Sequence, residues 1–462
     1  MSKVEKLEKD EIESVDTPSF LKGKVITGEL LYPKEPPRFL KKDLEDLFLW
    51  ATEQGASDIN FQTGSPVMLD IYGKKHKVTR RKLIQSEIQE IVVVMYGNES
   101  AKGQLAGSKD IDCAYEIKPN RHARLRFRIN ATAINIEGTT GIQITARTIP
   151  IDIPSLKDMK LAKELEDNIV PNKGMVVVTG ATGSGKSTLL AAIVRSIADN
   201  PDSHKKILTY EAPIEFVYDA IKPEPVSTLI SQCEIGKHLP SFADGTRNAL
   251  RRKPDIIIVG ESRDAETIGE AVTASMTGHL LYTTVHSNGF ADTIRRMVNV
   301  FPEGERNAKA VEIITNLKIV ISQVLVPGVD GKRVALREYV IMNNDIVDEL
   351  LNHGLDNLAN ACRKILMNHG CSFLDDAQQK FDEGKISKEV LKDFIFNASA
   401  EERDIAESKR NKLTSIFGED VAKKIIEKDL DINELTPEKI IEMSDDIMIS
   451  DQGIHHSKKE SK

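Results

Sequence analysis

The sequence predicts an α/β protein, in which a small α+β domain precedes a larger domain with a parallel sheet and a helical extension follows. Three observations carry this prediction. A buried-strand pattern, MVVVTG, runs directly into the glycine-rich stretch GATGSGKST and then into a helical pattern, STLLAAIVRSIAD. Further short apolar runs alternate with helical segments, which is typical of parallel sheets covered by helices. Beyond about residue 345, strand patterns give way to helical ones.

Composition excludes several classes of protein. The chain has 462 residues, enough for two or three domains, and a net charge of −8, which argues against a surface that binds nucleic acid as a whole. No signal sequence is visible, and no apolar run approaches the ~20 residues of a membrane-spanning helix. The four cysteines are scattered without a CxxC pair, so no zinc site is expected. We expect a cytoplasmic protein that reaches a membrane only through partners.

Four segments are expected along the chain. Residues 1–36 are charged and end near several prolines, which favours a disordered arm. Residues 37–150 form the α+β domain, with a helix over DLEDLFLWATEQG and strands over DINFQ, VMLDIYG, ARLRFRINATAI and IQITARTI. Residues 151–345 form the P-loop domain, with further strands over KKILTYE, PDIIIVGE and HLLYTTV. Residues 346–462 form the extension, with helices over KEVLKDFIF and EDVAKKIIEKD and a disordered end.

The glycine-rich stretch has the spacing of a phosphate-binding loop, G-x-x-x-x-G-K-[ST]. Glycines let backbone N–H groups turn toward phosphate oxygens, and the N-terminus of the following helix adds partial positive charge. The lysine is expected to reach the β and γ phosphates of ATP, and the serine to bind Mg²⁺. The predicted nucleotide-binding residues are Gly180, Ala181, Thr182, Gly183, Ser184, Gly185, Lys186, Ser187 and Thr188.

Carboxylates follow two of the predicted strands. Glu211 and Glu215 come after KKILTY, at the strand end where open α/β sheets bind ligands, and one of them could orient the water that attacks the γ phosphate. Ordinary loop acids would give the same pattern. Gly260 stands where a Walker B strand usually carries an aspartate, so Glu261 is the carboxylate there that could assist Mg²⁺.

Histidines and arginines complete the candidate set. Two histidines flank the strand HLLYTTV and suit either phosphate sensing or structural hydrogen bonding. In RHARLRFRIN, arginines alternate with apolar residues, so three guanidinium groups lie on one face of a strand. Nucleotide phosphates, nucleic acid or a partner's carboxylates would relieve their repulsion, and a solvated face is the alternative. These residues are His279, His286, Arg124, Arg126 and Arg128, with Arg147 on a neighbouring strand.

Taken together and in order, the motifs resemble those of the PilT-like secretion ATPase superfamily, which includes pilus retraction motors and the traffic ATPases of type II and type IV secretion. GASDINFQTG is similar to a motif of that family's N-terminal domain, and GATGSGKST to its Walker A motif. TYEAPIEFVY, ALRRKPDIIIVGESRDAETI and TGHLLYTTVHSN are similar to its Asp box, Walker B region and His box. The resemblance implies a PAS-like N-terminal domain, a RecA-like ATPase domain and a hexameric ring.

The resemblance also implies roles for individual residues. Glu211 would be the general base that activates water, and Glu261 would hold Mg²⁺ through water. His279 and His286 would form the His-box pair. The arginines would act on nucleotide bound at an interface between subunits; they are Arg128 and Arg147, with Arg124 and Arg126.

Four stretches resemble the DotB-type ATPases of type IVB (Dot/Icm) secretion and their conjugative-plasmid relatives: DIYGKKHKVTRRKL, SKDIDCAYEIKPNR, HLPSFADGTRNALRRKP and RDAETIG. This implies a hexamer that acts with secretion or conjugation proteins at the inner membrane, without nucleic acid as a direct ligand. Two features depart from the wider family. Ala212 replaces the acid that usually follows Glu211, and NLANACRKILMNHG keeps little of the AIRNLIRE-like helix of retraction motors. Three alternatives stay open: a pilus retraction motor, a nucleic-acid motor and a non-hydrolysing, nucleotide-gated adaptor.

Overall fold

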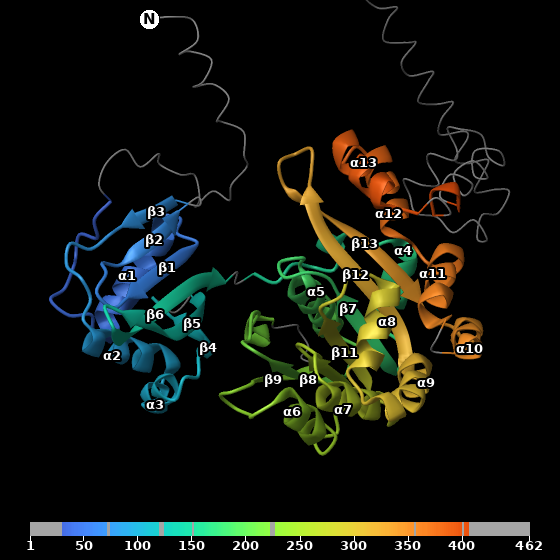
Figure 1. Cartoon of the computed structure of the whole chain (residues 1–462), viewed down its shortest axis with the longest axis horizontal. Coiled ribbons are helices and arrows are strands. Elements are labelled where there is room, and N and C mark those ends of the chain that lie inside the picture. Colours follow the sequence, from blue (N-terminus) through green and yellow to red (C-terminus); the bar gives the residue numbers. More distant parts are fainter. Residues whose placement is uncertain are drawn as a thin grey trace, which may run out of the picture. The chain divides into compact units, whose positions relative to one another are not determined.

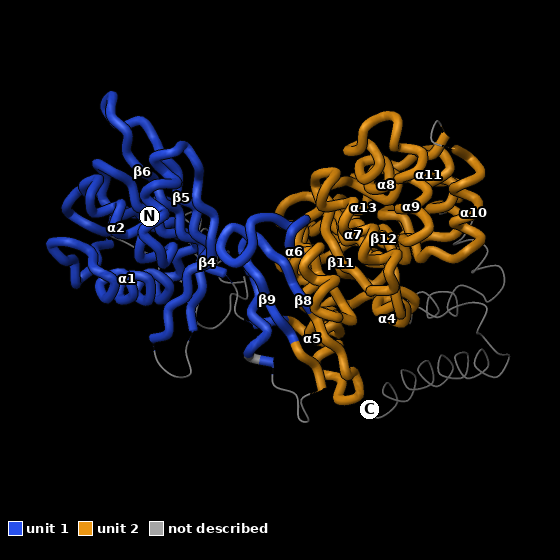
Figure 2. Tube along the Cα trace, turned by 90° about the horizontal axis from the view of Figure 1, so that it is seen from below, with its two compact units in different colours: residues 1–153, 208–222, 230–245 blue, residues 154–207, 223–229, 246–462 orange. Residues whose placement is uncertain are grey.

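The structure is a computed structural model that describes residues 30–71, 74–119, 124–149, 152–221, 227–354, 357–399 and 402–405. The chain divides into two compact units, which Figure 2 distinguishes by colour. The first unit consists of residues 1–153, 208–222 and 230–245, and the second of residues 154–207, 223–229 and 246–462. None of the helices within these described ranges is long and apolar enough to cross a membrane.

A six-stranded antiparallel sheet with the order β3-β2-β1-β6-β5-β4 is central to the first unit (Figure 1). Helix α1 buries one apolar stripe, and the ring of its Phe48 packs edge-on against Phe127 of β5, with ring centroids 4.4 Å apart. The elements are α1 (Lys41–Glu53), β1 (Asp58–Gln62), β2 (Met68–Ile71), β3 (Lys74–Lys77), α2 (Gln85–Tyr96), α3 (Ser100–Ala106), β4 (Ile111–Ile117), β5 (Leu125–Ile136) and β6 (Thr139–Ile149).

Residues 30–36 differ from the expected disordered arm. Tyr32 is buried, its backbone N–H donates to the carbonyl of Val78, and its ring lies 5.2 Å from that of Trp50. Glu35 accepts hydrogen bonds from the backbone N–H groups of Arg80 and Arg81. An aromatic ring and an acceptor therefore hold this stretch on the first unit, while residues 1–29 of the predicted arm lie outside the described residues.

The second sheet has seven strands in the order β13-β12-β7-β11-β10-β8-β9. Strands β12, β7, β11 and β10 pair in parallel, and β13 runs antiparallel to β12. Buried parallel strands read as continuous apolar runs, and β7, β10 and β11 are buried throughout. The strands are β7 (Gly174–Thr179), β8 (Lys206–Glu211), β9 (Leu229–Glu234), β10 (Ile256–Val259), β11 (Leu280–Val285), β12 (Leu317–Pro327) and β13 (Arg333–Ile341).

Helix α4 precedes these strands along the chain, and the other helices lie between them or beyond the last of them. They are α4 (Lys163–Asn168), α5 (Lys186–Asp199), α6 (Phe242–Ala249), α7 (Ala265–Met276), α8 (Phe290–Asn299), α9 (Arg306–Asn316), α10 (Asn344–His353), α11 (Leu358–His369), α12 (Phe373–Asp382) and α13 (Lys388–Asn397). Helices α12 and α13 share a small apolar core with the β12–β13 hairpin, built from Val326, Leu336, Leu374, Ala377, Ile386 and Leu391.

The predicted architecture is confirmed: an α/β chain with an N-terminal α+β domain, a P-loop sheet and a helical extension. The segment EDVAKKIIEKD and the predicted disordered end lie outside the described residues. The sequence analysis did not predict β12 and β13, although LKIVISQVLVP and RVALREYVI are rich in β-branched residues. These two strands prove important for the candidate site.

Candidate functional site

The phosphate-loop segment connects the buried strand β7 to helix α5 in the second unit. Three of its glycines have positive φ: Gly180 at 143°, Gly183 at 80° and Gly185 at 85°. A Cβ atom on Gly180 would lie 2.3 Å from the carbonyl oxygen of Gln323, so no side chain fits there. The loop therefore turns tightly against β12 and ends at the N-terminus of α5, where backbone N–H groups are available to an anion.

Lys186 is buried at the start of α5, with 8% of its surface exposed. Its ammonium group donates to the carbonyl oxygens of Gly180, at 2.8 Å, and Ala181, at 2.9 Å. These neutral acceptors hold the cation over its own loop. A phosphate oxygen would be a stronger, charged acceptor for the same ammonium group.

Glu261 and His286 gather near this lysine at the carboxyl ends of β10 and β11. The Oε1 atom of Glu261 lies 3.8 Å from Nε2 of His286. Burial and the nearby Lys186 ammonium lower the pKa of His286, against the opposing effect of Glu261. The imidazole is therefore largely neutral at pH 7 and can serve as a hydrogen-bonding group rather than a cation.

A buried cluster of hydroxyl groups joins the phosphate loop to the loop that carries His286. The hydroxyl of Thr179, the last residue of β7, donates to the carbonyl of Ser287 at 2.8 Å and lies 2.6 Å from the Ser287 hydroxyl. The Ser287 hydroxyl lies in turn 2.8 Å from that of Thr293 in α8. A shift of either loop would break buried hydrogen bonds, so these contacts couple the two loops.

His279, the other predicted His-box residue, is not brought to this edge. It precedes β11, whereas His286 follows it, and its carbonyl accepts from the backbone N–H of Gly174 at the start of β7. Its Nδ1 lies 3.1 Å from the Thr277 hydroxyl and 3.2 Å from the Ala274 carbonyl. His279 makes structural hydrogen bonds at the end of α7. Because a full strand separates it from His286, the geometry gives no support to a catalytic role for His279 at the phosphate-loop edge of this chain.

The predicted row of arginines lies on β5 and at the residue before it, in the first unit, and faces carboxylates of the same unit. Arg124 forms a two-pronged ion pair with Asp219, at 2.7 and 2.9 Å, and Arg128 forms one with Asp112, at 2.6 and 3.1 Å. Arg126 is 4% exposed, and one of its N–H groups donates to the carbonyl of Ile214 at 2.6 Å.

These pairs identify what relieves the repulsion between the arginines. The anions come from β4 and from residues 215–219 of the same chain, and Glu215 also lies 3.7 Å from Arg128. Burial lowers the pKa of the Arg126 guanidinium, with the nearby carboxylates opposing that effect. Arg147, opposite Arg128 on β6, pairs with Asp58 at 2.8 Å and leaves 69% of its side chain exposed. Of the four arginines, Arg147 is therefore the most accessible to another molecule.

Glu211 ends β8 and belongs to the first unit. Its Oε1 accepts hydrogen bonds from the Thr209 hydroxyl at 2.6 Å and from the Gln232 side-chain amide at 3.1 Å. Burial raises the pKa of this carboxyl, against the opposing effect of those two donors. A carboxylate with a raised pKa is a better proton acceptor, which suits a general base.

A basic cavity of about 500 Å³ adjoins the phosphate loop within the second unit. Gly185 and Thr188 line one side, and residues of β12, β13 and α12 line others. Its charged lining comprises Lys160, Lys332, Arg333, Arg337, Lys380 and Lys385, with Asp158 and Asp330. This excess of cations next to the loop favours an anionic ligand.

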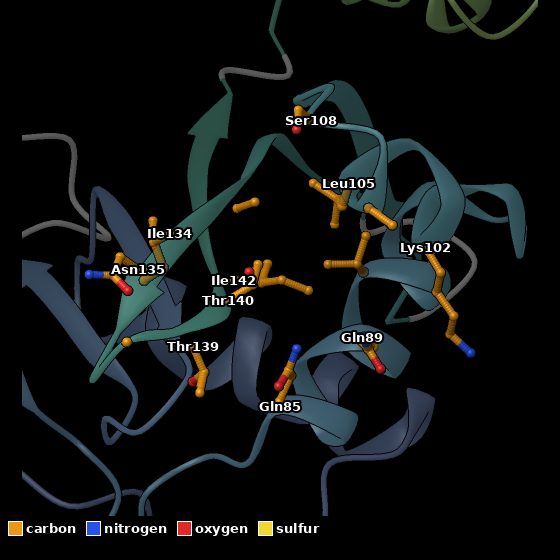
Figure 3. A pocket seen from close by; sticks show the side chains of 14 residues that line it. Gln85, Gln89, Lys102, Leu105, Ser108, Ile134, Asn135, Thr139, Thr140 and Ile142 are labelled. Atoms are coloured by element: carbon orange, nitrogen blue, oxygen red, sulfur yellow. The ribbon is translucent and has the colours of Figure 1, made fainter.

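A second cavity, of about 550 Å³, lies in the first unit between α2, α3 and the β5–β6 hairpin (Figure 3). Gln85 and Gln89 approach it from α2, and Thr139 and Thr140 from the hairpin. Among the described residues that line it, Lys102 is the one charged side chain, and it already pairs with Glu90 at 2.7 Å. One already paired cation among amide, hydroxyl and apolar side chains offers phosphate little, so this cavity does not suit the phosphates of a nucleotide.

The donor set near the loop fits a magnesium ion that binds together with a nucleotide. No three His, Cys, Asp or Glu side chains gather as ligands anywhere in the described part of the chain. Ser187 in the first turn of α5 and Glu261 offer one hydroxyl and one carboxylate, both partly exposed. Mg²⁺ keeps several waters and takes phosphate oxygens, so it needs few protein ligands.

Gln323 and Arg337, which the sequence analysis did not predict, support the phosphate loop on the side of β12. Gln323 of β12 donates from its side-chain amide to the carbonyl of Ser184 at 2.6 Å, and Arg337 of β13 donates from Nε to the Gln323 side-chain oxygen at 2.8 Å. Both side chains are buried. Polar residues inside otherwise apolar strand patterns were the available signal, because a buried polar group needs a specific partner.

Comparisons with known proteins agree with this geometry. The family model described as "Type II/IV secretion system protein" matches residues 35–436. The crystal structure of the Legionella pneumophila ATPase DotB is 46% identical, covers 80% of this chain and 100% of its own, and superposes with a TM-score of 0.76. That of the Yersinia pseudotuberculosis ATPase DotB is 33% identical, covers 79% of this chain and 97% of its own, with a TM-score of 0.63.

A curated relative comes from a different system. A "Twitching motility protein" of Neisseria gonorrhoeae is 38% identical over 277 residues, which are 60% of this chain and 70% of the relative. The family match spans most of the chain, so this protein belongs to the type II/IV secretion system protein family, whose resemblance the motifs had indicated.

Proposed function

We propose that this protein is a ring-forming, hexameric ATPase that couples ATP hydrolysis to type IVB secretion or conjugative transfer across the cell envelope. The observation that carries the proposal is the similarity to DotB of Legionella pneumophila, which extends over the whole of that chain at 46% identity. The protein would act in the cytoplasm and associate with inner-membrane secretion proteins.

The nucleotide would bind in the second unit. Its β and γ phosphates would take the N–H groups of the loop and the Lys186 ammonium, in exchange for the carbonyls that Lys186 contacts now. The anionic nucleotide would extend past Thr188 into the basic cavity, whose volume of about 500 Å³ lies in the range of small-molecule sites. Ser187 and Glu261 would hold Mg²⁺, which would stabilise charge on the phosphates during transfer.

Roles of the remaining residues follow the family motifs. Glu211 would accept the proton of the attacking water, for which its raised pKa is suited. His286, neutral at pH 7, would report the state of the γ phosphate to the Thr179–Ser287 hydroxyl contacts. Arg147, with Arg128, would act on nucleotide at an interface between subunits, which requires the pairs with Asp58 and Asp112 to open.

Hydrolysis and nucleotide affinity of purified protein test the enzymatic part. The wild-type chain is expected to bind and hydrolyse ATP with Mg²⁺. Lys186→Ala should lose binding, and Glu211→Gln should keep binding but lose turnover. Tight binding without turnover in the wild type would instead identify a nucleotide-gated adaptor, for which Ala212 is the motivating residue. Steep stimulation by single-stranded DNA would identify a nucleic-acid motor.

A pilus retraction motor is the second candidate, because the Neisseria gonorrhoeae twitching motility protein is 38% identical over 277 residues. Capture experiments in the native host separate the two. Glu211→Gln should hold ATP and stabilise complexes, and mass spectrometry then identifies what co-purifies. Recovery of inner-membrane coupling and secretion-core proteins supports the proposal, whereas recovery of pilins and a pilus platform protein contradicts it.

A further inference from the structure

Gln323 determines how one peptide group of the phosphate loop is oriented. Its side-chain amide donates to the carbonyl of Ser184, and a Cβ on Gly185 would lie 2.9 Å from the same nitrogen. In a planar trans peptide, the C=O of one residue and the N–H of the next point in opposite directions. Holding the Ser184 carbonyl against Gln323 therefore directs the Gly185 N–H away from β12, toward the side of the loop where a phosphate binds.

Arg337 fixes the Gln323 amide in the orientation that this contact needs. Gln323 and Arg337 are direct partners across the antiparallel β12–β13 pair. The Arg337 Nε–H donates to the Gln323 side-chain oxygen at 2.8 Å, so the side-chain nitrogen of Gln323 must face Ser184. Both residues are nearly inaccessible, at 3% and 5% exposure, and both lie at the wall of the basic cavity beside the loop.

Helix α12 holds the outer edge of β13 at this point. The backbone N–H of Arg337 donates to the carboxylate of Asp376 at 2.7 Å. Two residues further, Tyr339 and Cys371 exchange backbone hydrogen bonds of 2.9 and 3.0 Å. Two outer N–H groups of this edge strand, those of Arg337 and Tyr339, are thus satisfied by the helical extension, whose helix α12 lies beside β13 (Figure 1). Asp376 is itself 8% exposed and lies 3.6 Å from the Lys380 ammonium.

We propose that Asp376, Arg337 and Gln323 are positioning residues of the ATPase, through which helix α12 sets the orientation of the Ser184–Gly185 peptide and so the affinity for nucleotide. This inference rests on the proposed function. It gives the helical extension a role in the nucleotide site: when α12 moves relative to β13, the phosphate loop loses one correctly oriented N–H donor.

Two near-isosteric variants of the whole protein test this series of hydrogen bonds. Gln323→Met removes the donor to Ser184, and Asp376→Leu removes the acceptor for the Arg337 N–H without touching the loop. A hydrogen bond to a charged phosphate corresponds to about 1.5–3 kcal/mol, or roughly a tenfold to hundredfold change in affinity. We expect the Kd for ADP and the KM for ATP to rise at least about tenfold in Gln323→Met, with kcat at saturating ATP changed much less.

Matched variants separate positioning from loss of structure. Asp376→Asn keeps an acceptor oxygen and should restore the affinity that Asp376→Leu loses. Ser322→Ala, on the same strand but the opposite face, removes a buried hydroxyl that has no hydrogen-bond partner among the described residues, and this variant should bind nucleotide as the wild type does. Thermal unfolding without nucleotide checks that each variant is folded.

The outcomes distinguish this inference from the proposed function. Unchanged nucleotide affinity in a folded Gln323→Met overturns the inference while the ATPase assignment stands. Weakened affinity in Gln323→Met but not in Asp376→Leu overturns the role of α12 as proposed. An equal fall of kcat in all variants, Ser322→Ala included, also overturns it, because general loss of structure would then explain the data. Absence of nucleotide binding in the wild type would contradict the proposed function itself.

Discussion

Replacing Glu338 by glutamine should make the stability of the second unit less sensitive to pH. Glu338 lies on β13, 9% exposed, and its Oε1 accepts a 2.6 Å hydrogen bond from the backbone N–H of Phe290 at the start of α8. Burial raises the pKa of this carboxyl to about 7, although the Phe290 N–H opposes the change, and the nearby carboxylate of Glu402 raises it further.

The size of the effect follows from that pKa. A carboxyl that titrates near 7 when folded and at 4.5 when unfolded binds its proton more tightly in the folded state. The wild type therefore loses stability as pH rises from about 4.5 to 7, and the loss is complete above that window. The difference, 7 − 4.5 = 2.5, corresponds to an upper value of about 3 kcal/mol at about 1.36 kcal/mol per pKa unit. Glutamine keeps an acceptor for Phe290 but does not titrate.

Urea unfolding of both proteins at pH 5, 6, 7 and 8 measures this difference, with pulsed hydrogen exchange of α8 and β13 peptides reporting on the second unit. The free energy of unfolding of Glu338→Gln minus that of the wild type should increase with pH and level off near pH 8. Asp348→Asn, at an exposed position on α10, likewise removes one carboxylate and controls for the change in net charge. A difference that is flat or falls with pH would refute the reasoning, because Glu338 would then be no harder to ionise when folded than when unfolded.

Two further predictions concern other contacts. Arg126→Met should destabilise the first unit by about 2–3 kcal/mol, because it leaves buried carbonyls without a donor. Arg147→Met removes an exposed ion pair and should destabilise the same unit by under about 0.5 kcal/mol. Urea unfolding followed by the fluorescence of Trp50, the one tryptophan of the chain, checks both, and equal costs would contradict the difference in burial. Thr179→Val should lower the free energy of unfolding by about 1–3 kcal/mol, since the buried Ser287 carbonyl loses its hydroxyl donor. Hydrogen exchange of β7 and α8 peptides measures this loss. Unchanged protection would contradict the coupling of the two loops.

Local patterns were sufficient to predict the elements that carry the phosphate loop. The run MVVVTG is an uninterrupted apolar segment that predicts a buried strand, and the glycine spacing predicts the turn into α5 from the local sequence alone. The helix α1 and the strands β1, β5 and β6 were predicted for the same reason, since their apolar periodicity is visible within each segment.

Contacts between segments far apart in the chain could not be predicted from the sequence. Alternation predicted that the arginines of β5 share a face and need an anion, but Arg124 meets Asp219, 95 positions away, which no local pattern indicates. His279 shows a different limit. Its place in a motif with His286 suggested a shared role, yet six strand residues between them put the two at opposite ends of β11. Membership of one motif does not place two residues at one edge of a sheet.

Adjacent residues of strand β13 act on different loops. Successive residues of a strand point to opposite faces, so Arg337 lies opposite Gln323 and serves the phosphate loop, while Glu338 lies opposite Ser322 and holds the N-terminus of α8. The backbone N–H of Arg337 lies on the outer edge, where Asp376 accepts it. Strand β13 is thus linked to the phosphate loop through Gln323, and it contacts the helix that follows His286 and the helical extension directly. If α12 displaced the edge of β13, both loops would be affected together.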